Sequence, residues 1–130
     1  MRPKKPILLY CADRNLLAVT AFVLRLQPYD VVAVYSDKAA LSLAKAAGAA
    51  YACGILIHAQ PADPAGLLIH RLLECGSQIP LLLVDRAGDL APVRYADLVL
   101  YGRNTAMEHI LAALRVLCHR KPGPTARRTA

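Results

Sequence analysis

The stretch PILLYCADRNLLAVTAFVLRLQPYDVVAVYS, residues 6–36, contains a predicted strand, a predicted helix and a second predicted strand in immediate succession. Residues 6–11 form a short continuous apolar run, as expected for a strand that is buried on both faces. Residues 13–27 then place apolar side chains at helical spacing, and Pro28 ends that pattern. Residues 29–36 return to an apolar composition rich in valine, which is typical of a strand. This order predicts a strand–helix–strand unit with two parallel strands.

The same alternation continues to the end of the chain. Further strands are predicted at 51–58, 79–85 and 96–102, and further helices at 38–48, 64–75 and 105–120. Candidate capping residues stand at all four helix starts: Asp13 or Asn15, Ser36 or Asp37, Asp63 followed by Pro64, and Thr105 with Glu108. Five strands that alternate with helices predict an α/β fold with a five-stranded parallel doubly wound sheet. The flavodoxin-like strand order 2-1-3-4-5 suits this length.

The connection between the fourth and fifth predicted strands breaks the pattern. It contains only RAGDLAPVRY, residues 86–95, with Pro92 inside. A helical crossover needs a dozen or more residues, and proline disrupts a helix interior. We therefore predict an irregular loop in this place, with a shortened or missing fourth helix.

Length and charge limit the domain organisation. A chain of 130 residues suits one domain, predicted here at 6–119, with a basic tail at 1–5 and a basic tail or linker at 120–130. The net charge of +7 comes from these ends, because the body has nine basic and nine acidic residues. Nucleic-acid binding by the domain itself is therefore not expected. No apolar stretch reaches the roughly 20 residues of a membrane span, which favours a cytoplasmic location.

Residues that carry chemistry follow several predicted strands. In open parallel sheets, ligands bind at the carboxyl ends of the strands, beside the switch in strand order. The residues at those ends are Cys11, Ala12 and Asp13 after the first strand, His58 after the third, Asp85 after the fourth and Tyr101 in the fifth. The sequence therefore predicts that any functional site lies at this edge.

From about residue 6 to residue 119 the chain resembles the receiver domain of bacterial response regulators, of the chemotaxis type. PILLYCADRNLL resembles the first receiver strand and its turn, and in ILIH…G the residue Gly66 follows His58 by eight positions. That spacing matches the phospho-acceptor aspartate and the glycine at the start of the third helix. IPLLLVDRAGD and ADLVLYGRN resemble the fourth and fifth strands with their following loops.

The resemblance also shows where this chain departs from the family. The family's phosphorylation-site positions fall, in chain order, on Cys11, Ala12, Asp13, His58, Asp85, Val99 or Tyr101, and Gly102 with Arg103. Among these, the magnesium-binding acidic pair corresponds to Cys11 and Ala12, and the acceptor aspartate to His58. The switch hydroxyl corresponds to Asp85 and the lysine to Gly102. The resemblance thus implies an atypical pseudo-receiver with a degenerate phosphorylation site.

These replacements carry a chemical consequence. Magnesium prefers oxygen ligands in octahedral geometry, which a thiol and a methyl group do not supply. Phosphoryl transfer to an aspartate needs that aspartate, the metal and a cation that neutralises developing charge. We therefore predict a regulatory module of bacterial signal transduction, without cofactor or enzymatic activity, that acts through phosphorylation-independent protein–protein interaction. Its expected partner is another protein or an output domain.

The predicted interaction surface is the connection between the fourth and fifth strands. It carries charged and aromatic residues where a helix would normally cover the sheet, namely Arg86, Asp89, Arg94 and Tyr95, and Tyr101 of the fifth strand belongs to the same predicted surface. Loops on rigid scaffolds often bind partners. A homodimer through this loop and the last helix is one form that such binding could take.

Two other readings of the cysteines and histidines remain open. Cys11, His58 and Asp85 are the residue types of a metal or small-ligand sensor, or of a small cysteine-dependent enzyme. A structural alternative pairs His58 with Asp85 or Asp13 inside the sheet. The four cysteines are widely spaced and form no CxxC pair. Cys118, near the chain end, could be exposed, and an intermolecular disulfide on storage is favoured for it over a redox role.

Overall fold

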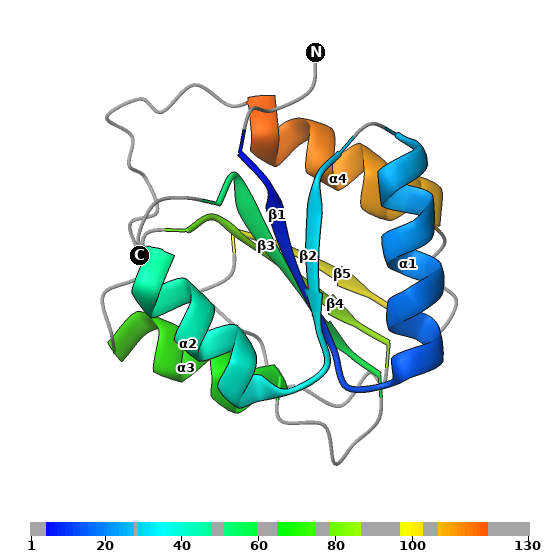
Figure 1. Cartoon of the computed structure of the whole chain (residues 1–130). Helices are drawn as coiled ribbons and strands as arrows, with labels where there is room; N and C mark the ends of the chain where they lie inside the picture. Colours follow the sequence, from blue (N-terminus) through cyan, green and yellow to red (C-terminus); the bar gives the residue numbers. More distant parts are fainter. Residues whose placement is uncertain are drawn as a thin grey trace.

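Five strands alternate with four helices in the part of the chain that the computed structural model describes, residues 5–27, 29–47, 51–59, 65–74, 79–86, 97–102 and 107–119 (Figure 1). In chain order they are β1 (Ile7–Cys11), α1 (Arg14–Leu26), β2 (Val31–Val34), α2 (Asp37–Ala47), β3 (Cys53–His58), α3 (Ala65–Glu74), β4 (Leu81–Asp85), β5 (Leu98–Tyr101) and α4 (Met107–His119). Each predicted strand and helix is present, with ends that differ by about two residues. The predicted irregular loop around Pro92 lies outside the described residues.

The sheet is parallel throughout, in the order β2-β1-β3-β4-β5. This confirms the predicted doubly wound fold with the flavodoxin-like order. β1, β3 and β4 are buried along their whole length, because neighbouring strands and helices enclose them on all sides. Their continuous apolar sequences reflect this burial on two faces.

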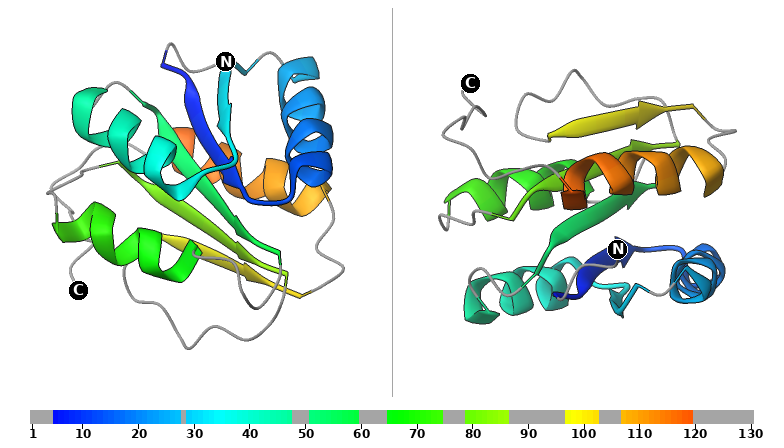
Figure 2. Two further views of the ribbon diagram at one scale, coloured as in Figure 1. Left: turned by 60° about the horizontal axis from the view of Figure 1, so that its bottom comes forward. Right: turned by 90° about the horizontal axis from the view of Figure 1, so that it is seen from above.

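Helices cover both faces of the sheet (Figure 2). Strand side chains alternate between the faces, so each strand contributes to two separate cores. On one face, α1 and α4 pack over Ile7, Leu9, Cys11, Cys53, Ile55, Ile57, Leu82 and Val84. On the other face, α2 and α3 pack over Leu8, Tyr10, Leu56, Leu81 and Leu83. Which core a strand residue joins therefore decides which helices it can contact.

Side chains cap the first two helices. The Oδ1 atom of Asp13 accepts hydrogen bonds from the backbone N–H groups of Asn15 at 3.0 Å and Leu16 at 3.1 Å. The hydroxyl of Ser36 accepts one from the N–H of Ala39 at 3.3 Å. Asp13 and Ser36 are thus the caps among the predicted alternatives. No helix within the described ranges is long and apolar enough to cross a membrane.

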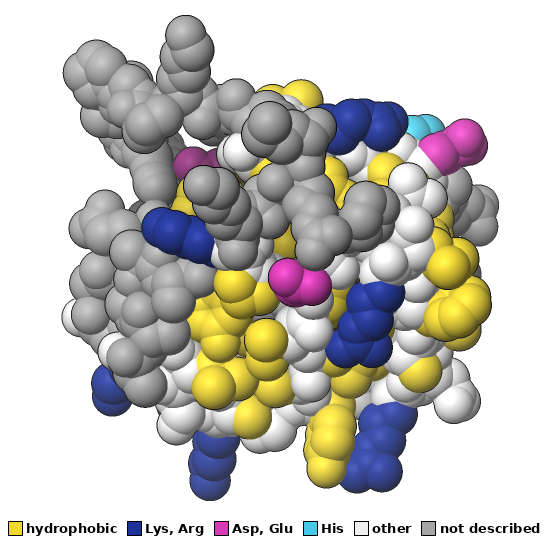
Figure 3. All heavy atoms as spheres, turned by 45° about the horizontal axis from the view of Figure 1, so that its top comes forward, with side chains coloured by type: hydrophobic (Ala, Val, Ile, Leu, Met, Phe, Trp, Pro, Cys, Tyr) yellow, Lys and Arg dark blue, Asp and Glu magenta, His cyan; other side chains and the backbone are white. Residues whose placement is uncertain are grey.

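The apolar residues of α1 divide between the core and the surface. The helix buries Leu17, Thr20, Ala21 and Leu24 against the sheet. Val19, Phe22 and Leu26 belong to the same helical pattern in the sequence, yet they are 57%, 62% and 64% exposed. Figure 3 shows hydrophobic side chains gathered at the surface on the side where α1 lies. The periodicity predicted the helix correctly but did not show which apolar residues face inward.

Asp97 fixes the start of β5 beside β4. Its Oδ2 atom accepts a hydrogen bond from the N–H of Leu81 at 2.8 Å, and its own N–H donates to the carbonyl of Leu81 at 2.8 Å. Both groups therefore tie the edge strand to its neighbour at one point.

Candidate functional site at the carboxyl end of the sheet

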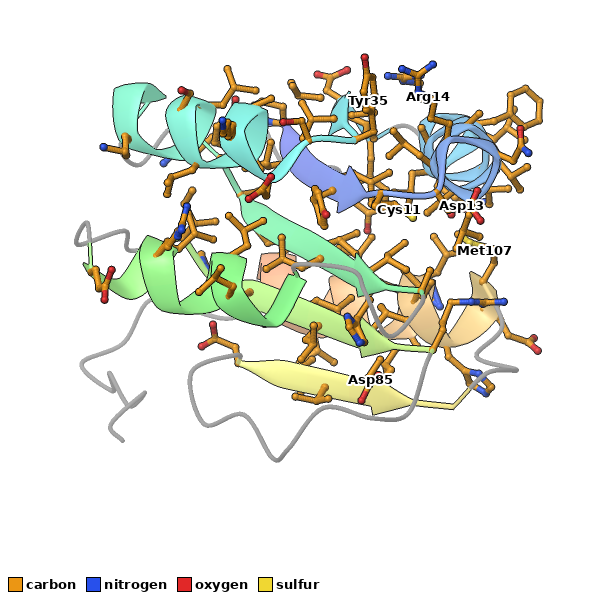
Figure 4. The ribbon with its side chains drawn as sticks, turned by 90° about the horizontal axis from the view of Figure 1, so that it is seen from below. Cys11, Asp13, Arg14, Tyr35, Asp85 and Met107 are labelled. Atoms are coloured by element: carbon orange, nitrogen blue, oxygen red, sulfur yellow. The ribbon has the colours of Figure 1, made fainter. Side chains whose placement is uncertain are left out.

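β1, β3 and β4 end on Cys11, His58 and Asp85, which all lie at the predicted edge. Their side chains are almost completely inaccessible, with exposed fractions of 0%, 1% and 0%. Figure 4 looks toward this edge and shows Cys11 near Asp13, with Asp85 on the far side of β3. The sequence therefore placed these residues at the correct end of the sheet.

The sheet itself separates Cys11 from the other two side chains. Cys11 belongs to the core beneath α1 and α4. Leu56 and Leu83 belong to the opposite core, and His58 and Asp85 follow them by two positions on the same strands. Because side chains two apart on a strand share a face, His58 and Asp85 lie on the α2 and α3 face.

A sensor or enzyme that used Cys11, His58 and Asp85 together would need the three side chains on one face of the sheet, and they are not. A metal site or a thiol–imidazole pair needs its side chains on one face and within bonding distance. Within the described residues, no group of three or more histidine, cysteine, aspartate or glutamate side chains could hold a metal ion. The expected convergence of Cys11 with His58 and Asp85 is therefore wrong at the level of side chains.

His58 and Asp85 are direct neighbours in the register of β3 and β4. Backbone hydrogen bonds hold both in place: the N–H of Arg86 donates to the carbonyl of His58 at 2.9 Å, and the N–H of Gly102 donates to that of Asp85 at 3.0 Å. The Nδ1 atom of His58 is buried and has no hydrogen-bond partner among the described residues, although the residue is engaged in other interactions. A buried carboxylate beside a buried imidazole fits the structural alternative of an internal pair, since burial of a lone charge is costly.

The end of β1 supplies few oxygen ligands for a metal cation. Ala12 is exposed, and Cys11 faces the core. Asp13 is the carboxylate at this position, and its Oδ1 already accepts the two hydrogen bonds that cap α1. Magnesium requires about six oxygen ligands, several of which are usually carboxylates or waters. The residues present at this edge therefore fit a magnesium site poorly.

Gly102 follows β5, at the position to which the resemblance assigns the receiver lysine. Its φ angle is 116°, a conformation that residues with a Cβ rarely adopt. Val99, one of the two candidates for the aromatic switch position, is half-buried in the core beneath α2 and α3. For Tyr101, the other candidate, the structure places the backbone, paired with Asp85 in register. Arg103 lies outside the described residues.

Substitution of Gly102 is expected to destabilise the protein. Gly102→Ala and Gly102→Lys should each lower the free energy of unfolding by about 1–3 kcal/mol, because a side chain at this φ introduces backbone strain. Urea unfolding of both variants measures this effect. Equal losses would assign it to the backbone, whereas full stability of Gly102→Lys would contradict the requirement for glycine.

Two further contacts were not predicted from the sequence. The guanidinium of Arg14, at the start of α1, lies 4.1 Å from the ring centroid of Tyr35, which follows β2, at this same edge (Figure 4). At the opposite end of the sheet, the sulfur atoms of Cys53 and Cys118 lie 4.0 Å apart. Cys118 is half-buried, which corrects the expectation of an exposed thiol. A sequence separation of 65 residues leaves no local pattern from which the cysteine contact could be found.

The predicted interaction surface is covered by the structure only in part. Arg86 is half-buried directly after β4. Asp89, Arg94 and Tyr95 lie outside the described residues, so the surface itself stays a prediction.

Comparison with solved structures defines the fold class. A receiver domain from Clostridium thermocellum superposes with a TM-score of 0.77 at 15% identity, covering 90% of this chain and 96% of that one. The receiver domain of the Francisella response regulator 1452 gives 0.74 at 13% identity, covering 90% and 98%. A streptococcal protein, described as one of a family of redox sensors that evolved from two-component response regulators, gives 0.71 at 23% identity. That match covers 88% of this chain and 51% of the streptococcal chain.

These likenesses show that the chain has the receiver fold. No known protein-family profile matches the sequence. No curated protein sequence matches it either. The identities of 13–23% are low enough that the comparison establishes the fold alone.

Proposed function

We propose that this chain is a receiver-fold regulatory module of bacterial signal transduction that acts through protein–protein interaction, without phosphorylation of an aspartate. The fold supports a signalling role, since the structural neighbours include receiver domains of response regulators. The proposal includes a cytoplasmic location and no catalytic activity.

One observation carries the proposal: β3 ends on His58, a buried imidazole that lies beside Asp85. By the resemblance, the phospho-acceptor aspartate belongs at this position, where a phosphoryl donor must reach it. A side chain that is 1% exposed offers little access to such a donor. The poor set of magnesium ligands at the end of β1 supports the same conclusion, because phosphoryl transfer relies on charge neutralisation by a metal.

The streptococcal neighbour adds support from a different direction. That protein is described as a redox sensor that evolved from response regulators, so in it a receiver-type fold serves to detect a redox signal. Since this chain spans about half of the streptococcal chain, only the shared domain enters the comparison. A changed input in this chain is therefore compatible with its fold.

The interaction surface in this proposal is the connection between β4 and β5 together with α4. Val116 on α4 is 54% exposed, and exposed apolar side chains of this kind mark a contact surface where they cluster. A partner protein or output domain would bind here, or a second copy of the chain would form a homodimer.

An NMR titration of amide resonances tests the proposal. Addition of magnesium and beryllofluoride, a mimic of the phosphoryl group, should leave the resonances near Asp13, His58 and Asp85 unchanged at millimolar concentrations. The physical reason is the lack of an acceptor aspartate and of an oxygen-rich metal site. A conventional receiver domain, titrated in parallel, provides the positive control.

The opposite result has a clear meaning. Saturable shifts around His58 and Asp85 with both reagents would show a working phosphoryl site and overturn the proposal. A response to zinc alone, centred on Cys11 and His58, would instead favour the metal-sensor reading. A dilution series of the same sample reports self-association, because a homodimer predicts concentration-dependent shifts on α4.

A further inference from the structure

The contact between Cys53 and Cys118 lies at the amino end of the sheet, away from the candidate site. Cys53 is the first residue of β3 and is fully buried. Cys118 is the penultimate residue of α4 and is half-buried. Their sulfur atoms are 4.0 Å apart and share a hydrogen bond. Both cysteines are reduced in this structure.

Packing of α4 on the sheet explains why these residues meet. Cys53 faces the core beneath α1 and α4, where it joins Ile55 and Ile57 of the same strand. The inner face of α4 is buried in that core and includes Leu114 and Leu117. Cys118 follows on the last turn and packs against the edge of the same core. The two thiols are therefore held together by the hydrophobic packing of a whole helix.

We propose that Cys53 and Cys118 form an oxidisable dithiol, which closes into a reversible intramolecular disulfide when the protein meets a peroxide. This inference goes beyond the proposed function and does not depend on it. A disulfide has a sulfur–sulfur bond of about 2.05 Å, so the sulfur atoms must approach by roughly 2 Å. Because Cys118 lies one residue from the helix end, a rotation of its side chain or a small shift of the last turn can supply this movement.

The surroundings assign different roles to the two thiols. When Cys118 is ionised, its thiolate accepts the hydrogen bond from the thiol of Cys53, and this lowers the pKa of Cys118 in opposition to its partial burial. The same hydrogen bond raises the pKa of Cys53 well above its usual value, with further contributions from burial and from the negative charges of Cys118 and Asp97. A helix carboxyl end disfavours an anion, so we expect a moderate rather than a large gain in reactivity. Cys118, the more accessible of the two, is the attacking thiolate.

Other ionisable groups surround this pair. Tyr29 lies close enough for both cysteines and Arg115 to influence its phenol, and its pKa is raised by burial first and by the charge of Cys118 second. Arg115 is exposed on the turn of α4 that precedes Cys118. At neutral pH, Tyr29 is therefore an uncharged neighbour, and Arg115 is a cation three residues before the reactive thiolate on the same helix.

The chemistry balances with hydrogen peroxide as the oxidant. The thiolate of Cys118 attacks one peroxide oxygen, the O–O bond breaks, and the departing hydroxide takes up the thiol's proton to become water. Cys118 is then a sulfenic acid. The sulfur of Cys53 attacks the sulfur of Cys118 and loses its own proton, and the S–O bond breaks to release a second water. Two thiols lose two electrons, and one peroxide gains them.

The disulfide would tether the last turn of α4 to the first residue of β3. It closes a loop between residues 53 and 118, and a covalent loop of that length restricts the unfolded chain strongly. We expect the midpoint of thermal unfolding to rise by about 10 °C on oxidation. The same bond fixes the end of the helix that leads into residues 120–130.

Peptide mapping of the full chain tests the proposal. The reduced protein is treated with hydrogen peroxide and then unfolded in urea with N-ethylmaleimide present, so that the reagent reaches every free thiol. It is digested with trypsin without reductant. We expect one main cross-linked product, which joins the peptide 46–71 to the peptide 116–120 and disappears on addition of dithiothreitol. The protein should take up two maleimide groups after oxidation in place of four before it, since the chain has four cysteines.

Matched variants identify the thiols involved. Cys118→Ser and Cys53→Ser should each abolish the cross-linked product, whereas Cys75→Ser should leave it unchanged. The rise in thermal midpoint should be absent in the first two variants and present in the third. Full maleimide labelling of Cys53 and Cys118 after oxidation would overturn the proposal. A product that joins Cys118 to Cys75 or Cys11, or one that runs as a dimer without reductant, would overturn it as well.

Discussion

Replacement of His58 by aspartate should lower the free energy of unfolding by about 3–4 kcal/mol and should not restore a receiver phosphorylation site. Aspartate is the residue that the resemblance assigns to this position. In this chain, however, His58 is 1% exposed and lies beside the fully buried Asp85 in the register of β3 and β4. Two carboxylates would then be adjacent in an environment that solvates charge poorly, so their repulsion and their desolvation both oppose folding.

His58→Asn is the matched control for the charge. It is similar in size to aspartate but neutral, and we expect it to cost about 1–2 kcal/mol through the loss of the imidazole's interactions. The difference between the two variants should shrink as the pH falls from 7 toward 4. The native state of His58→Asp gains more from binding a proton than the unfolded state does, so its stability falls as the pH rises.

Urea unfolding at several pH values measures both variants. Equal stability of His58→Asp and His58→Asn at pH 7 would show that charge at this position is tolerated. Stability of His58→Asp equal to that of the parent protein, together with saturable binding of magnesium and beryllofluoride, would show a repaired receiver site. Either result would contradict the view of His58 and Asp85 as an internal pair.

Leu24→Ala should lower the free energy of unfolding by about 3 kcal/mol, whereas Phe22→Ala should change it by less than about 0.5 kcal/mol. Both are large apolar residues of α1, two positions apart. Leu24 is fully buried between the helix and the sheet, so its truncation leaves a cavity. Phe22 is 62% exposed, so its truncation removes little buried area.

Chemical denaturation of these two variants tests the orientation of α1 directly. The ratio of the two effects matters more than either value, because both substitutions place alanine in the carboxyl-terminal half of the same helix. A large loss for Phe22→Ala with a small one for Leu24→Ala would mean that the helix is rotated. If the parent protein aggregates and Phe22→Ala reduces the aggregation, the exposed apolar side chains of α1 promote self-association.

The secondary structure and the strand order were predictable because they depend on local and repetitive features. Continuous apolar runs, helical spacing and the turn residues between them identified each strand and helix. The order 2-1-3-4-5 followed from the alternation of strands with helices and from the short length. The position of Cys11, His58 and Asp85 at one edge of the sheet followed in turn, since parallel strands all end at the same side.

The arrangement of side chains around those backbone positions was less predictable. Alternation along β1 and β3 places Cys11 and His58 on opposite faces, and this depends on the exact register of neighbouring strands. A shift of one residue would reverse the result. The inward face of α1 is a similar case, because the helix has more apolar residues than its contact with the sheet can bury.

The sequence by itself determined the class of fold and the edge at which a site would lie, and it predicts a departure from the receiver residues at that edge. These conclusions rest on which residue types occur and in what order. Only the tertiary structure decided that His58 lies beside Asp85, that Cys11 is separated from both, and that Cys53 meets Cys118 across 65 residues. Contacts of that kind arise when helices pack on a sheet, and no local pattern in the chain encodes which side chains that packing brings together.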